Sequence, residues 1–166
     1  DSCRDGLYKA THIHHPSVVW VAERAEHYNW LSVHLEALCD EYSDRYGRCH
    51  KTQEDGIVTR LIYAPKKQKF YNGEALPLTV AMAPEFKFFD IKNWDDVTTT
   101  YRLYYVLDKE RFAKWKMGNE PVWFTQGKQC LSTILDAKHA TMSSKEIAES
   151  LKENGHWENL AHAVRC

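Results

Sequence analysis

The stretch YNWLSVHLEALCDEYSDRY, residues 28–46, determines the predicted fold class. Its large apolar side chains recur every three or four residues, so they fall on one side of an α-helix. The members of this stripe are Tyr28, Leu31, Leu35, Leu38, Tyr42 and Tyr46. Gly47 follows directly, and glycine often ends helices because it tolerates the left-handed conformation. The stretch therefore predicts a long amphipathic helix that ends at Tyr46.

The residues before this stretch also predict helix. Pro16 suits a first helical position, because its missing N–H would have no partner there in any case. We expect a helix to begin at Pro16 or Ser17 and to break or bend near Ala25. His15, which precedes this start, lies where backbone N–H groups and the helix dipole favour an anion.

A second long helix is predicted at residues 96–117. Asp95 or Asp96 can cap its start, and Gly118 followed by Pro121 can end it. Its apolar stripe consists of Val97, Tyr101, Tyr104, Phe112 and Trp115. We expect this stripe to pack against the stripe of the first long helix.

Residues 51–93 lack helical periodicity, and a short strand is predicted at 57–63. A third helix is expected at 129–139 and a short fifth from Trp157. The fourth opens at Ser143-Ser144-Lys145-Glu146, which has the form of a capping box.

These elements predict a mainly α protein, a compact helical domain with two long amphipathic helices packed together and a small irregular or β insertion. Residues 1–124 would form a helical core domain. Residues 125–166 would form a C-terminal helical extension with a pattern like a helix-turn-helix.

The overall composition shows no strong electrostatic preference. The sequence has 22 Lys and Arg against 23 Asp and Glu, a net charge of −1. Because strong nucleic-acid binders usually carry a basic surface, any phosphate binding must depend on local patches. No stretch approaches the roughly 20 apolar residues that a membrane span requires, so we expect no membrane partner.

The cysteines are odd in number, widely spaced and without a CxxC pair, which is typical of free thiols in the cytoplasm. They are Cys3, Cys39, Cys49, Cys130 and Cys166. The His12-x-His14-His15 group has no neighbouring Cys motif or paired carboxylate for zinc, so we expect neither a metal nor another cofactor. The first residue is Asp rather than Met, which predicts a fragment or a processed product.

The first long helix carries a polar margin beside its apolar stripe, formed by His27, His34, Glu41 and Arg45 at helical spacing. Glu41 and His34 are the candidate catalytic acid/base pair, and Arg45 is a candidate phosphate contact. The competing interpretation is an ordinary Glu–Arg pair one helical turn apart with two surface histidines.

Further candidate phosphate or nucleic-acid contacts are His50 and Lys51, which crowd the end of the same helix together with Arg48. The second long helix repeats the pattern with Arg102, Tyr105 and Lys109. Cations and a tyrosine in one cleft suit phosphates and stacked bases. Structural roles for the same cations, at a helix C-terminus or above aromatic rings, compete with this interpretation.

One basic run has aromatic neighbours, Lys66, Lys67 and Lys69 followed by Phe70 and Tyr71. This combination can follow a nucleic-acid backbone. A solvated lysine loop is the alternative.

Several motifs together resemble an uncharacterised protein family of tailed bacteriophages, over residues 6–124. They are GLYKATHIHHP (6–16), WL (30–31), LCDEY (38–42), RYG (45–47), HK (50–51), YRLYY (101–105), FAKW (112–115) and PVWF (121–124). More distantly, their order is similar to that of the small helical pyrimidine-dimer DNA glycosylases of phages. Those enzymes use an N-terminal amine and a Glu on the first helix, for which this chain has no counterpart.

The leading hypothesis is a phage-type accessory protein of the host cytoplasm that binds nucleic acid or nucleotide phosphates. Glycosylase-like or nuclease-like chemistry at Glu41 and His34 would make it an enzyme, and the sequence leaves that question open. The alternatives are a protein-binding module that inhibits a host factor, and a virion or assembly component.

Overall fold

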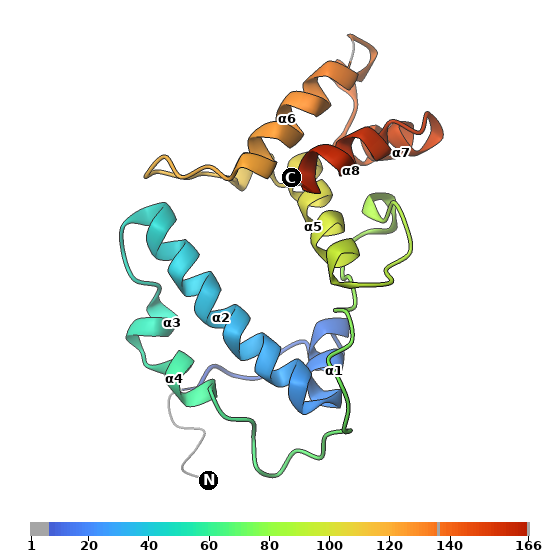
Figure 1. Ribbon diagram of the computed structural model, residues 1–166. Coiled ribbons are helices and arrows are strands. Elements are labelled where there is room, and N and C mark those ends of the chain that lie inside the picture. The colour runs from blue at the N-terminus through green and yellow to red at the C-terminus, as the bar shows by residue number, and fades with distance from the viewer. Residues whose placement is uncertain (1–6, 136, 166) are drawn as a thin grey trace. The chain divides into compact units, whose positions relative to one another are not determined.

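The protein is described here from a computed structural model that covers residues 7–135 and 137–165 (Figure 1). The covered chain forms eight α-helices and three short 3₁₀ helices. Extended pairing within it is limited to one isolated parallel bridge, between Arg24 and Tyr71. The prediction of a mainly α protein is confirmed, whereas the predicted β insertion is wrong for the covered residues. None of the covered helices is both long and apolar enough to cross a membrane.

The chain divides into two compact units. The first unit comprises Asp1–Thr79 with Trp115–Asn119, and the second comprises Val80–Lys114 with Glu120–Cys166. The two long helices fall in different units, so their mutual packing stays a prediction.

The first unit is built on a pair of consecutive helices, α1 (Pro16–Glu23) and α2 (Ala25–Tyr46). The predicted start at Pro16 and the predicted break near Ala25 are confirmed, since Arg24 is extended between the two helices. Gly47 ends α2 with a φ of 66°, as predicted, and its N–H donates to the Ser43 carbonyl. Two short helices follow, α3 (Lys51–Glu54) and α4 (Ile57–Leu61).

A buried histidine joins three segments of this unit. His27 is fully buried and stacks on Trp20 with ring centroids 3.9 Å apart. Its Nε2 accepts from the Leu76 N–H at 2.9 Å, so the ring proton lies on Nδ1 and is donated to the Trp20 carbonyl at 2.6 Å. The imidazole thereby ties α1, α2 and the segment at residue 76 together.

The strand predicted at residues 57–63 is wrong, because α4 occupies residues 57–61. Short apolar runs suit both a strand and a buried helical turn, and contacts distant in sequence decide between them. Here the Tyr28 hydroxyl and the Ser32 hydroxyl both donate to the Leu61 carbonyl at the end of α4, at 3.0 and 3.2 Å. These bonds fix α4 beside α2 (Figure 1).

The apolar stripe of α2 is only partly covered. Leu31 is 40% exposed and Leu38 is 52% exposed, while the buried residues of α2 are His27 and Cys39. The periodicity therefore predicted the helix correctly but not which side of it is buried.

The second unit contains the remaining long helix, α5 (Trp94–Asp108), and a C-terminal group of three, α6 (Val122–Ile134), α7 (Ser144–Glu153) and α8 (Trp157–Arg165). Three short 3₁₀ segments accompany them, η1 (Pro84–Phe86), η2 (Glu110–Phe112) and η3 (Ala137–Thr141). The capping box at Ser143 and Glu146 and the helix from Trp157 are confirmed. The third helix lies at 122–134 rather than 129–139.

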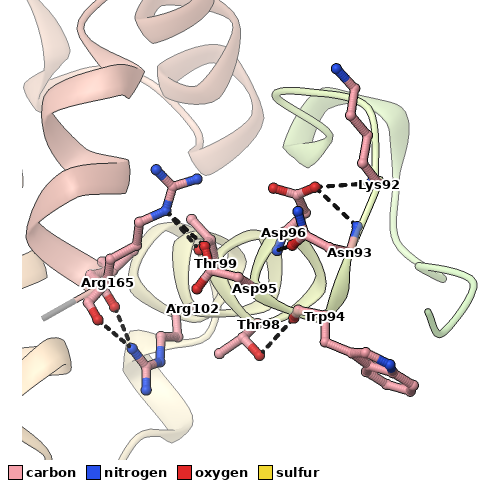
Figure 2. Close-up of polar contacts among 10 residues, drawn as sticks. Lys92, Asn93, Trp94, Asp95, Asp96, Thr98, Thr99, Arg102 and Arg165 are labelled. Carbon is pink, nitrogen blue, oxygen red and sulfur yellow. Dashed lines mark hydrogen bonds and ion pairs between the residues drawn. The ribbon is translucent and has the colours of Figure 1, made fainter.

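The α5 helix differs from its prediction at both ends. Asn93, rather than Asp95 or Asp96, is its N-cap, and Asp96 completes a capping box by accepting from the Asn93 N–H (Figure 2). The helix ends at Asp108, so Phe112, which is 59% exposed, lies beyond it. The helical spacing of apolar residues in the sequence therefore continues beyond the end of α5.

The core of the second unit forms where α5, α6 and α8 meet. Leu103 and Val106 of α5, Phe124 of α6 and Leu160 and Val164 of α8 are each at most 1% exposed. The domain boundary predicted at residue 124 falls inside α6. The division into a helical core domain of residues 1–124 and a C-terminal extension of residues 125–166 stays a prediction.

Gly127 lets α6 approach its neighbours closely. A Cβ there would lie 2.8 Å from a methyl carbon of Val106 and 2.8 Å from one of Val164. We expect Gly127→Ala to lower the free energy of unfolding, because overpacking costs about 1–3 kcal/mol and outweighs the helix-propensity gain of about 1 kcal/mol. Urea unfolding measures the change, with Gln126→Ala at an exposed α6 position as the control. A more stable Gly127→Ala variant would show that the valines can move aside.

Candidate nucleic-acid interface

Cationic and aromatic side chains gather where α2 ends. We name this group the α2 end cluster: Tyr42, Arg45, Tyr46, Arg48, His50, Trp115 and Lys116. All seven belong to the first unit, because Trp115–Asn119 returns to it from the second. The left-handed Gly47 turns the chain at this point and brings Arg48 and His50 back beside the helix end.

Glu41 attaches residues 115–119 to α2. Its Oε1 accepts from Arg45 Nε at 2.5 Å and from Trp115 Nε1 at 3.1 Å. The Arg45 guanidinium lies 4.3 Å from the centre of the Trp115 ring, and the Arg45 carbonyl accepts from the Lys116 N–H. The predicted Glu–Arg pair is therefore present, with a tryptophan as a third member that the helical spacing did not reveal.

The other cations of the cluster lie over rings. Arg48 is 5.7 Å from the centre of Tyr42, and Lys116 is 5.8 Å from the centre of Tyr46. His50 meets Tyr42 edge to face at 4.8 Å. Within the part of the chain that the structure covers, no carboxylate pairs with Arg48 or Lys116. Their charge is thus available to an anion.

The remaining candidates near helix ends have structural partners. Lys51 pairs with Asp55 at 2.7 Å, and this hydrogen bond raises the pKa of the lysine. His50 Nδ1 accepts from the Thr52 N–H and caps α3, and His15 Nδ1 accepts from the Ser17 N–H and caps α1. In each histidine the other ring nitrogen is the one that remains for a ligand.

His34 lies apart from Glu41. Seven residues separate them, which is about 10 Å of rise along α2, and no hydrogen bond joins the two side chains in the covered chain. His34 stacks on Trp30 with ring centroids 4.7 Å apart, and partial burial lowers the pKa of the imidazole. Direct proton exchange between the two predicted catalytic groups therefore has no support in this arrangement.

The candidates on α5 take part in the packing of the second unit. Arg102 donates to the carbonyls of Val164 and Arg165 at the end of α8, at 2.7 and 3.4 Å (Figure 2), and lies over Trp123. Tyr105 meets the Trp123 and Phe124 rings edge to face.

Lys109 pairs with Asp108 at 2.6 Å, which raises the pKa of the lysine and lowers that of Asp108. Because α2 and α5 belong to different units, the predicted cleft between their polar margins stays a prediction.

The cysteines and histidines form no metal site in the covered residues, where no group of three or more His, Cys, Asp or Glu side chains is close enough to hold an ion. Cys39, Cys49 and Cys130 are free thiols, and burial raises the pKa of Cys39. Cys3 and Cys166 lie outside the covered residues.

We expect the pKa of His34 to lie below the ordinary value of 6.5, because partial burial disfavours the charged ring. A folded state that binds the proton less well loses stability as the pH falls through this range. An NMR titration measures the pKa, with His34→Gln identifying the resonance. A value at or above 6.5 would contradict the burial of this ring.

We expect Arg102→Ala to lower the free energy of unfolding by about 1–3 kcal/mol, the range for losing a charge-assisted hydrogen bond. The carbonyls at the end of α8 would lose their donor. Arg111→Ala is the control, since Arg111 is exposed and lies over Phe112. Equal stability of both variants in urea unfolding would instead leave Arg102 available as a phosphate contact.

Comparison of the chain with models of protein families, with curated proteins and with solved structures gave no match. The similarity to a phage family therefore stays a resemblance carried by the motifs alone. The interpretation of the site rests on its geometry.

Proposed function

We propose that the first unit binds nucleic acid, or the phosphates of nucleotides, through the α2 end cluster. The observation that supports this most directly is the placement of Arg48 and Lys116 over aromatic rings without carboxylate partners in the covered chain. Cations without partners attract phosphates, and partly exposed rings offer faces on which bases stack. The resemblance to a phage family agrees with a role in the cytoplasm of an infected cell.

A catalytic role for Glu41 is a further part of this proposal. In a base-excising reaction a carboxylate would stabilise positive charge that develops on the sugar. Because Oε1 of Glu41 accepts from Arg45 and Trp115, this role would fall to Oε2. Arg45 would then fix the position of the carboxylate while its neighbours hold the phosphates.

A second candidate is a protein-binding module that inhibits a host factor or takes part in virion assembly. The exposed Leu31 and Leu38 favour it, since they lie seven residues apart on one side of α2. Salt dependence separates the two functions, because counterion release from phosphates makes affinity fall steeply with salt.

The test uses Arg48→Ala/Lys116→Ala and a labelled oligonucleotide. We expect the slope of log affinity against log salt to become shallower by about 1.4, since each lost phosphate contact on a single strand contributes about 0.7. The matched control is Lys87→Ala/Lys92→Ala, which removes the same charge from exposed positions of the second unit. Equal slopes for both double variants would exclude the α2 end cluster as the phosphate site.

A further inference from the structure

Charge is strongly segregated within the first unit. Residues 48–71 contain six Lys and Arg and two acidic residues, whereas α2 contains five acidic residues and one basic residue. Residues 48–71 therefore carry a net charge of about +4, whereas the whole chain carries −1. A local concentration of positive charge of this kind can follow a phosphate backbone.

The positive residues extend to the other end of α2. After α4 the chain continues as a loop, residues 62–73, which we name the lysine loop because it carries Lys66, Lys67 and Lys69. None of these three lysines pairs with a carboxylate among the residues that the structure covers, and all are exposed.

The backbone of this loop is fixed at the junction of α1 and α2. The Tyr71 N–H donates to the Glu23 carbonyl at 2.7 Å, and the Gln68 side-chain amide donates to the Ala22 carbonyl at 2.9 Å. Arg24 donates to the Asn72 carbonyl at 3.0 Å. These bonds fix the backbone positions of the three lysines, although the lysine side chains are in solvent.

Two aromatic rings accompany the lysines. Tyr63 is 84% exposed and Tyr71 is 74% exposed. A tyrosine left in solvent forgoes the burial that usually stabilises an aromatic side chain. Aromatic rings beside cations can stack on the bases of a single strand. In a duplex these base faces are already stacked on each other, so the rings favour a single strand.

The two basic regions lie at opposite ends of α2. The helix has 22 residues and is therefore about 33 Å long. Between the ends, α3 and α4 follow α2 back toward α1 (Figure 1), held by the bonds from Tyr28 and Ser32 to Leu61. At about 3.4 Å per stacked nucleotide, a strand of about ten nucleotides reaches from one end to the other.

We infer that the ligand is single-stranded nucleic acid and that its path runs from the α2 end cluster along α3 and α4 to the lysine loop. This inference rests on the proposed function and extends it to a second contact region. Lys66 and Lys67 hold phosphates, and Tyr63 and Tyr71 stack on bases at the far end of the path.

The experiment measures fluorescence anisotropy of labelled oligothymidylates of about 16 and about 4 nucleotides, the limits of common single-strand site sizes, with the full chain. Lys66→Ala/Lys67→Ala should make the salt slope for the long strand shallower by about 1.4. Tyr63→Ala/Tyr71→Ala should weaken binding of the long strand by about fivefold or more. Neither variant should change binding of the short strand, which cannot reach both regions from the α2 end cluster.

The outcomes separate the inference from the proposed function. If only Arg48→Ala/Lys116→Ala weakens the long strand, the α2 end cluster binds nucleic acid and the extended path is wrong. Binding of neither oligonucleotide at low salt would overturn both. Tighter binding of a duplex of equal length, or loop-dependent binding only to vesicles of anionic lipid, would also overturn the inference. Lys87→Ala/Lys92→Ala again controls for net charge, and unchanged helical circular dichroism shows that the loop variants fold.

Discussion

The buried imidazole of His27 is the interaction on which the first unit depends. Among the covered residues this unit buries few apolar side chains, namely Trp20, Cys39 and Ile57, so apolar burial alone stabilises it weakly. His27 donates to the Trp20 carbonyl and accepts from the Leu76 N–H, and it stacks on Trp20. A single polar side chain therefore fixes both the angle between α1 and α2 and the start of the segment that leads to the second unit.

The two units differ in the interactions that stabilise them. The second unit holds most of the buried apolar side chains of the covered chain, packed around α5 and α8. The first unit instead fixes its backbone by hydrogen bonds and leaves cations, tyrosines and leucines in solvent. Such a surface contributes little to stability, because its side chains bury little apolar area.

Several helix ends that depend on one or two residues were predicted correctly from the sequence. Pro16, Gly47 and the Ser143–Glu146 pair each restrict the backbone directly, and each marks a helix end as expected. Residues 57–61 could not be assigned from the sequence, because the bonds that make them helical come from Tyr28 and Ser32 on α2. Trp115 has the spacing of a helical core residue, yet its indole N–H donates to the carboxylate of Glu41, 74 positions earlier in the chain. Of the predicted phosphate contacts, Arg45 and His50 lie in one cluster, whereas the partners of Arg102 at the end of α8 cannot be inferred from spacing.

The return of Trp115–Asn119 to the first unit affects the order in which the protein can form during synthesis. Residues up to 79 leave the ribosome long before residue 115, so α2 must wait, with its C-terminal end incomplete, while the first segment of the second unit is made. The Trp115 indole that donates to Glu41 and the Lys116 N–H that donates to the Arg45 carbonyl both belong to this later segment. The cationic surface at the end of α2 is thus completed by a segment that the ribosome supplies only after all of α5 has been made, which ties the maturation of the proposed binding site to the synthesis of the first segment of the second unit.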